Sequence, residues 1–357
     1  MVVVKQVRYI IFLFIVALLS LIFTSCSDEN VESVENIKSS DITITSNELD
    51  SLIESTPDNG VLDLGNKQII IKGKPVDIEK NITIKGGVLK RAKTSVAVVI
   101  SLVTAGSKRI VVANASIFKE GDWVAVVNPN NKAINENSGV KNGLITNVTG
   151  NVITLSNVHE KSMPVGSICI SSYQLIRPSI GFYIVFDGVT FDGNKQFNDY
   201  THDWSYNGAM TIKSGHIVRN CNFKDMPSDN IHVGAGAIIE KNTFSNLNGS
   251  FVHFSNPNGG LEETIVRYNT GDGICQAQDN GHNEGAFTFS NNSSNLLIIG
   301  NSFKNGTSCY GIQTLEDINI NVNKNVFENF DKKINLIEEG HLDPLDISSD
   351  IFINVPR

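Results

Sequence analysis

Two consecutive copies of one sequence unit constrain the fold of this chain more than any other feature. The copies begin at Gly215 and Gly236 and read GHIVRNCNFKDMPSDNIHVGA and GAIIEKNTFSNLNGSFVHFSN. Their phenylalanines, Phe223 and Phe244, lie 21 residues apart, a spacing typical of solenoid repeats. A triplet ending in Phe recurs at residues 189–191, 221–223, 242–244, 301–303 and 325–327, with a degenerate copy at 268–270. The pattern predicts an array of stacked repeats, here called rungs.

Each rung contains short runs rich in Ile and Val, separated by turns rich in Asn, Ser, Asp and Gly. The runs alternate with period two and are too short for helices, which indicates strands. We expect each strand to stack in parallel on the equivalent strand of the next rung, with the Phe side chains inside. Asn242, Asn301 and Asn325 would form a ladder at the adjoining turn, because Asn tolerates the left-handed conformation and its amides bond along a stack.

These repeats resemble the right-handed parallel β-helix of the pectate lyase-like superfamily over roughly residues 61–355. The resemblance implies an all-β solenoid. It implies no particular activity, because β-helices of this kind include lyases, hydrolases, epimerases, phage tailspikes and adhesins.

The N-terminus has the pattern of an export signal. Lys5 and Arg8 precede an apolar run over residues 9–23, and small residues then precede Cys26. This resembles a bacterial lipoprotein signal peptide, which implies cleavage after residue 25 and membrane attachment through lipid on Cys26. The acidic residues that follow resemble the surface-export tag of Bacteroidetes lipoproteins, which implies an outward-facing location at the outer membrane. A single transmembrane anchor is the alternative, although a span needs about 20 apolar residues.

The rest of the chain divides by changes in this rhythm. The predicted segments are a flexible tether (26–46), an N-terminal cap with the first rungs (47–94), a small β-rich insertion (95–180), and the remaining rungs with the C-terminal end (181–357). Residues 47–54 read as a short helix with Asn47 as its cap, covering the open end of the solenoid. The insertion has either a structural or a binding role.

Charge and motifs exclude several classes of function. The formal net charge is -8, and removing Lys5 and Arg8 takes it to about -10, which disfavours nucleic acid as a partner. An acidic polysaccharide requires a local basic patch. No GxSxG, P-loop or HExxH motif occurs, so the common nucleophile, phosphate and metalloprotease motifs are absent. Any chemistry must come from residues that stack in columns.

One such column contains two histidines. His232 and His253 each follow a rung phenylalanine by nine residues, so they are predicted to be stacked neighbours that face outward at about 4.8 Å. Thr211 falls in the same column, Lys213 lies two residues along on the same face, and Asp229 closes the turn before His232.

These residues suit acid/base chemistry. A polysaccharide lyase needs a base, a cation to stabilise the enolate, and an acid for the leaving oxygen. Lys213, a histidine and a carboxylate or bound Ca²⁺ would supply these roles, and the strand TIKS around Lys213 is similar to the strand bearing the base in β-helix lyases of the chondroitinase B and alginate lyase type. Alternatively, the column is simply an outward polar surface without catalytic function.

Two insertions add candidate ligand-binding residues. The long loop DGNKQFNDYTHDWSYNG follows Phe191, and loops of this length are often functional. Its candidates are Trp204, Tyr206 and His202 for sugar binding and Asp192, Asp199 and Asp203 for calcium or as a hydrolase pair. A later insertion contributes His282 to the far wall of a groove. A loop that only shields the sheet is the alternative.

Together these features predict a lipid-anchored β-helix that binds and cleaves an extracellular polysaccharide, with a lyase acting on a uronate-containing glycan as the favoured activity. A non-catalytic glycan-binding or adhesin solenoid is the alternative, and a glycoside hydrolase ranks third.

Overall fold

The computed structural model describes residues 43–128, 138–197, 208–255, 260, 262–276, 284–290, 295–312, 320–336 and 346–356. All of them belong to one compact unit, residues 41–357. The tether boundary was therefore placed slightly too late, because β1 (Thr43–Thr45) already pairs in parallel with β2 (Gly60–Ile71). Within the described part of the chain, no helix is both long and apolar enough to span a membrane.

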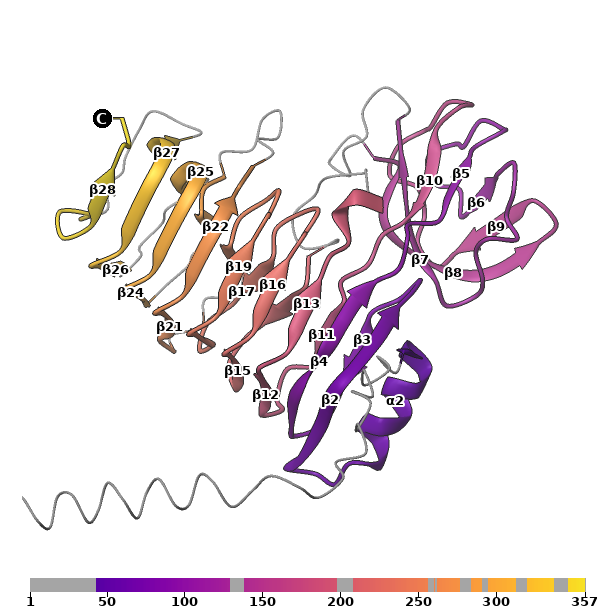
Figure 1. Ribbon diagram of the computed structural model, residues 1–357. Helices are drawn as coiled ribbons and strands as arrows, with labels where there is room; N and C mark the ends of the chain where they lie inside the picture. Colours follow the sequence, from indigo (N-terminus) through magenta and orange to yellow (C-terminus); the bar gives the residue numbers. More distant parts are fainter. Residues whose placement is uncertain are drawn as a thin grey trace, which may run out of the picture. The chain divides into compact units, whose positions relative to one another are not determined.

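The fold is a right-handed parallel β-helix, which confirms the predicted class (Figure 1). Each rung contributes one strand to each of three parallel sheets. The first sheet contains the N-terminal halves of β2 and β4 (Ile82–Arg91), then β12 (Ile184–Asp187), β15 (His216–Arg219), β18 (Ile238–Glu240), β21 (Thr264–Arg267), β24 (Leu296–Ile299) and β26 (Ile320–Asn323).

The second sheet continues each rung and carries the triplets. It contains the C-terminal halves of β2 and β4, then β13 (Thr190–Asp192), β16 (Asn222–Lys224), β19 (Thr243–Ser245), β22 (Thr270–Ile274), the first halves of β25 (Ser302–Ile312) and β27 (Val326–Leu336), and β28 (Ile351–Ile353). The solenoid thus continues into the polar C-terminal tail, since β28 forms a last parallel strand.

The third sheet completes the rung and carries the predicted histidine column. It contains β3 (Val76–Ile78), β11 (Ile176–Pro178), β14 (Met210–Ile212), β17 (Ile231–Val233), β20 (Val252–Ser255), β23 (Phe287–Ser290) and the second halves of β25 and β27. A short 3₁₀ turn (Lys195–Phe197) follows β13.

An internal column of apolar side chains runs along the second sheet. Its members, in rung order, are Ile69, Leu89, Phe191, Phe223, Phe244, Gly271, Phe303, Phe327 and Phe352. The Phe191 and Phe223 ring centroids lie 4.6 Å apart, and those of Phe223 and Phe244 lie 4.8 Å apart. The predicted stack is therefore present, and it extends into N-terminal rungs that carry Ile or Leu at this position.

The stack is interrupted at Gly271. This residue, and not Thr270, aligns with Phe244, so the degenerate triplet is residues 269–271 and the predicted alignment was wrong by one position. Phe251 fills the space, with its ring centroid 4.2 Å from that of Phe244 and 4.9 Å from that of Phe303. A Cβ at residue 271 would come within 2.8 Å of the Phe303 ring, so only glycine allows this packing.

The asparagine ladder lies at the turn between the first and second sheets. Side-chain amides of Asn242, Asn269 and Asn301 each donate to the carbonyl oxygen of the next ladder Asn at 2.9 Å, ending on Asn325. Asn269 was missed because of the alignment error. The prediction that the ladder asparagines themselves are left-handed was wrong. The left-handed residues are the ones immediately before them, Lys241, Tyr268, Gly300 and Lys324, and likewise Asn220 before Cys221, which occupies the equivalent position.

The helix α2 (Ser46–Ser55) begins one residue before the predicted range of 47–54. Thr45, and not Asn47, is the N-cap: the Glu48 N–H donates to Thr45 Oγ1, and the Thr45 N–H donates to Glu48 Oε2 at 2.6 Å. This reciprocal capping box satisfies two backbone donors that the first turn leaves free. Leu49 and Ile53 of the helix are buried in the same core as the first rungs, as expected for an end cap.

The β-rich insertion is a separate antiparallel sheet between β4 and β11. Its strands are β5 (Val96–Val98), β6 (Arg109–Val111), β7 (Trp123–Val127), β8 (Val140–Thr149), β9 (Val152–Leu155) and β10 (Ile168–Ser171). They pair in the order β5-β10-β7-β8-β9-β6, and an antiparallel bridge between Val99 and Val112 joins the two ends. This sheet has its own buried core. The solenoid continues directly across the insertion, since Phe191 after it pairs with Leu89 before it.

Candidate functional site

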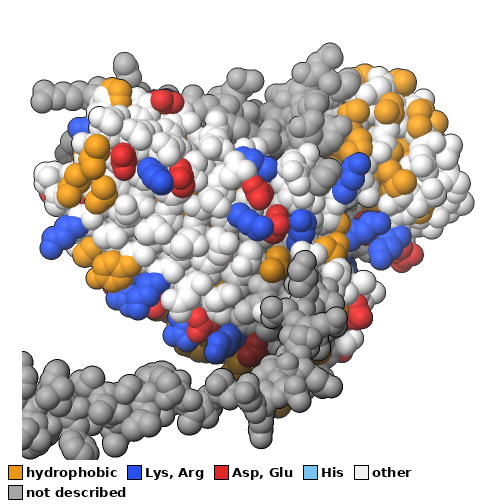
Figure 2. All heavy atoms as spheres, in the orientation of Figure 1, with side chains coloured by type: hydrophobic (Ala, Val, Ile, Leu, Met, Phe, Trp, Pro, Cys, Tyr) orange, Lys and Arg blue, Asp and Glu red, His pale blue; other side chains and the backbone are white. Residues whose placement is uncertain are grey.

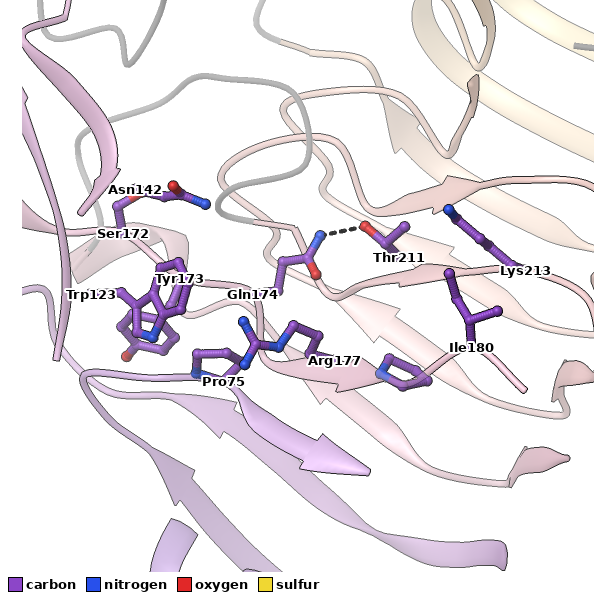
Figure 3. Close-up of a pocket in the computed structure, with 11 residues that line it drawn as sticks. Pro75, Trp123, Asn142, Ser172, Tyr173, Gln174, Arg177, Ile180, Thr211 and Lys213 are labelled. Carbon is purple, nitrogen blue, oxygen red and sulfur yellow. Dashed lines mark hydrogen bonds between the residues drawn. The ribbon is translucent and has the colours of Figure 1, made fainter. Parts of the chain in front are cut away.

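A pocket of about 290 Å³ opens where the insertion meets the third sheet (Figure 3). Its walls come from four parts of the chain: the residue before β3, the insertion, the segment that returns from it, and β14 with the residue that follows it. The residues that line it are Pro75, Trp123, Asn142, Ser172, Tyr173, Gln174, Arg177, Pro178, Ile180, Thr211 and Lys213. Two residues predicted for the site, Thr211 and Lys213, are among them.

Arg177 lies at the centre of this pocket. Its Nε and Nη2 donate to the two carboxylate oxygens of Asp77 at 2.5 and 3.0 Å, which fixes the plane of the guanidinium. The guanidinium carbon also lies 5.2 Å from the centroid of the Trp123 ring, a cation–π distance. The arrangement holds an arginine against a partly exposed aromatic ring, a combination that the sequence did not indicate.

The pocket lies on the same outward column as the histidines. Backbone N–H groups of Leu175 and Ile176 donate to the carbonyls of Gly208 and Ala209, which places Arg177 beside Thr211. Thr211 in turn aligns with His232, and His232 with His253. One column therefore runs from Asp77 through Arg177 and Thr211 to the two imidazoles.

Lys213 lies two residues beyond Thr211, as predicted. The next rung has Gly234 at the equivalent position, and a Cβ there would come within 3.0 Å of the Lys213 side chain. The glycine thus leaves room for the lysine to lie along the column. Within the described part of the chain, the Lys213 ammonium forms no ion pair with a carboxylate.

The two histidines are adjacent, and Asp229 lies next to both. The His232 and His253 ring centroids are 4.4 Å apart. Asp229 Oδ2 is 2.6 Å from His253 Nδ1 and 3.3 Å from His232 Nε2. The Ser250 N–H donates to the other carboxylate oxygen at 2.7 Å, which orients the carboxyl group. The predicted Asp229, His232 and His253 are thus brought together as a hydrogen-bonded cluster.

This cluster differs from the prediction in its burial. Ile231 and Val233 point into the core, so His232 does leave the strand on the outer side, as expected. However, only 8% of His232 and 2% of His253 are exposed, so neither imidazole presents an open surface. An alanine at residue 232 would remove a buried stacked ring, so we expect such a change to lower stability as well as to alter the column.

The Asp229 carboxyl is charged in spite of its burial. Desolvation by itself would raise its pKa, but the adjacent His253 and the hydrogen bonds from both imidazoles outweigh that effect and lower the pKa below its ordinary value of 3.8. Within the described residues, these three are also the only group whose donor atoms could converge on a metal ion. A metal would have to replace the hydrogen bonds that the imidazoles now make to Asp229.

Of the predicted calcium ligands, only Asp192 lies within the described residues. Asp192 projects from β13 of the second sheet, where it is 3.5 Å from the Lys90 ammonium and 3.3 Å from that of Lys224. Its charge is therefore balanced by cations. Figure 2 shows Lys and Arg side chains beside Asp and Glu on one face of the molecule. The other candidates, His202, Trp204, Tyr206, His282, Asp199, Asp203 and Cys26, lie outside the described residues.

Known proteins resemble this chain in architecture and not in sequence. No protein-family model matches the chain, and no curated protein sequence matches it significantly. Among solved structures, the Gp54 tailspike of Acinetobacter baumannii bacteriophage AP22, in complex with a capsular saccharide, is similar at 10% identity and a TM-score of 0.24, covering 87% of this chain and 74% of that one.

Two further structures show the same level of similarity. The tailspike gp61 of Pseudomonas phage phi297 is 11% identical, with a TM-score of 0.25, and the match covers 80% of this chain and 69% of that one. XylC in complex with xylose is 12% identical, with a TM-score of 0.36, over 76% of this chain and 58% of that one. The strand pairing itself defines the class: this chain is a right-handed parallel β-helix protein.

Proposed function

We propose that this protein is an exported lipoprotein that binds an acidic extracellular polysaccharide in the pocket beside β14. The observation that carries the proposal is that Arg177, Lys213 and the Trp123 ring line one open cavity on the outer face of the third sheet, with Trp123 and Lys213 at opposite ends and Arg177 between them (Figure 3). This basic pocket meets the condition that the net charge imposes, because an acidic chain must gather its cations locally to hold an anionic ligand.

Each wall of the pocket suits part of a uronate residue. An aromatic ring such as that of Trp123 offers an apolar face on which the C–H face of a sugar ring can lie. Arg177 keeps N–H donors beyond the two that Asp77 uses, and guanidinium groups bind carboxylates well. Gln174 already donates to Thr211 Oγ1 at 2.7 Å, which shows that hydroxyl-type acceptors are accommodated at this wall.

Elimination is the second candidate, and one observation favours it. Thr211, at the edge of the pocket, is directly in register with His232. Arg177 and Lys213 would stabilise the carboxylate charge of a uronate bound beside the histidine column. This stabilisation is required when a base removes the proton on the carbon next to that carboxylate. Under this proposal the protein belongs with the pectate lyase-like lyases, and Lys213 stabilises the enolate.

Binding can be tested with uronate-containing and neutral polysaccharides. We expect Arg177→Ala to weaken binding of the uronate polymer by about tenfold to a hundredfold, since a hydrogen bond to a charged group contributes about 1.5–3 kcal/mol. Arg219→Ala is the matched control, because Arg219 forms an equivalent exposed pair with Asp187 on the first sheet at 3.0 Å. Calorimetric titration of the Asn30–Arg357 fragment measures both affinities.

The titration, together with an assay of the reaction products, decides between binding alone, elimination and hydrolysis. Equal weakening by both substitutions, or equal affinity for neutral and acidic polymers, contradicts the pocket as a uronate site. Ultraviolet absorbance from an unsaturated product shows elimination, whereas new reducing ends without that absorbance show hydrolysis. Binding with neither product leaves a glycan-binding solenoid as the function.

The lipid anchor is a separate proposal that rests on the N-terminal sequence. We expect Cys26→Ala to move the protein from the membrane to the soluble fraction, because the thiol that carries lipid is lost, and we expect the native chain to incorporate labelled palmitate. If the variant remains in the membrane and the native chain incorporates no fatty acid, a single membrane-spanning segment is the correct interpretation instead.

A further inference from the structure

Three side chains on consecutive rungs form a hydrogen-bonded relay. Ser290 Oγ lies 2.8 Å from His253 Nε2, and His253 Nδ1 lies 2.6 Å from Asp229 Oδ2. A carboxylate can only accept, so Nδ1 carries the proton in this contact, and Nε2 of the neutral ring is then an acceptor for the serine hydroxyl. A hydroxyl, an imidazole and a carboxylate in this order are the parts of an activated serine nucleophile.

The register of the solenoid explains how these residues meet. Asp229 lies in the turn before β17, His253 is on β20, and Ser290 ends β23, so each comes from a different rung. His253 aligns with Thr288 of the next rung, and Ser290 follows Thr288 by two residues, so it lies on the same outer side of the strand. No short motif marks this arrangement, because its members are 24 and 37 residues apart in the sequence.

The carboxylate end of the relay is firmly held. The Ser250 N–H fixes one oxygen of Asp229, and His232 approaches the other while its ring stacks on that of His253. These contacts set both the tautomer and the orientation of His253, which is the role of the third member in such a relay. His232 is in this view a positioning residue.

We propose that Ser290, His253 and Asp229 hydrolyse acyl esters, with O-acetyl groups on saccharides as the substrate class. The hydrolysis goes beyond glycan binding, and only the choice of a saccharide carrier rests on the proposed function. Only 6% of Ser290 is exposed, so the small acetyl group, and not a long acyl chain, is the acyl group proposed. A saccharide carrier is consistent with the position of Ser290, which follows Lys213, Gly234 and Ser255 along one outward column.

The reaction balances with water as the second substrate. Ser290 Oγ bonds to the ester carbonyl carbon while its proton passes to His253 Nε2. The tetrahedral intermediate collapses, the bond to the sugar oxygen breaks, and that oxygen takes the proton from Nε2. Water then adds to the acyl-serine, gives its proton to Nε2, and the acid is released as Ser290 Oγ recovers the proton. Before attack, the hydroxyl can donate to the Phe254 carbonyl at 3.2 Å instead.

The test uses the full chain with 4-nitrophenyl acetate and a fluorophosphonate probe. We expect time-dependent release of nitrophenol and covalent labelling of the peptide that contains Ser290, detected by mass spectrometry. Ser290→Ala should reduce the hydrolysis rate by about 10³-fold or more, as for loss of a serine nucleophile. Ser255→Ala is the matched control, because Ser255 pairs with Ser290 in register but makes no contact with His253 in the described structure.

Labelling of the native chain does not depend on the folding of any variant, so a negative result is informative. Absence of label on Ser290, or a Ser290→Ala variant with native circular dichroism and an unchanged rate, overturns the proposal. Equal losses in Ser290→Ala and Ser255→Ala also overturn it. The probe and the ester contain no sugar, so the outcome is independent of whether the pocket at Arg177 binds a uronate.

Discussion

Replacing Phe244 by alanine is expected to lower the free energy of unfolding by about 3–5 kcal/mol, as other Phe-to-Ala changes in packed cores do. The ring is only 2% exposed and contacts Phe223 on one side and Phe251 on the other, at centroid distances of 4.8 and 4.2 Å. The next position in the column is Gly271, which has no side chain that could move into the space. The cavity would therefore stay open.

Urea denaturation followed by circular dichroism measures this loss. Tyr183→Ala is a suitable control, because Tyr183 is 53% exposed and its removal should change stability by less than about 0.5 kcal/mol. A Phe244→Ala variant as stable as the native chain would contradict the close packing of Phe244 between Phe223 and Phe251, since the core could then close without that ring.

A second large loss of stability is expected for Asp229→Ala, again about 3–5 kcal/mol, because removing one partner of a buried charged cluster leaves the others unsatisfied. Three groups lose an acceptor: the His253 and His232 imidazoles and the Ser250 N–H. Asp229→Asn keeps an acceptor oxygen and the side-chain shape, so its loss should be smaller. Asp272→Ala is the exposed control and should cost less than about 1 kcal/mol, since its pair with Lys304 is half-exposed.

The effect of Asp229 should also depend on pH. Because its pKa is lower in the folded protein than its ordinary value of 3.8, the carboxylate stabilises the fold above that value, and the contribution declines as the pH falls further. The difference between native and Asp229→Ala unfolding free energies should therefore be largest near neutral pH and shrink in acid. A difference that grows on acidification would show that Asp229 is protonated in the folded state.

Repetition in the sequence was sufficient to predict the solenoid and much of its register. Phe223 and Phe244, and likewise His232 and His253, are aligned because stacked rungs of equal length must superpose equivalent residues. The predicted alignment was wrong in the rung whose triplet does not end in phenylalanine. Gly271 replaces Phe, so the alignment moved by one residue and Asn269 was left out of the ladder.

The site was predicted only where it depends on register. His232 and His253 fall on one face because each follows its rung phenylalanine by nine residues. Thr211 aligns with them although the loop after Phe191 lengthens its spacing, and Lys213 lies two residues further on. Trp123 and Arg177 complete the pocket, yet they follow no repeat: one lies in the insertion and the other in the segment that returns from it. A tryptophan in an otherwise aliphatic strand and an arginine just before a proline were the only local signals.

The sequence by itself determined the parallel β-helix, because the period, the apolar alternation and the recurring triplet are local patterns that only stacked strands satisfy. Tertiary structure alone decided which polar residues meet. The insertion brings Trp123 to Arg177, and the stacking of three successive rungs brings Asp229, His253 and Ser290 within hydrogen-bonding distance. Contacts of this kind depend on side-chain direction and on burial by neighbouring segments, and neither is encoded in a one-dimensional spacing.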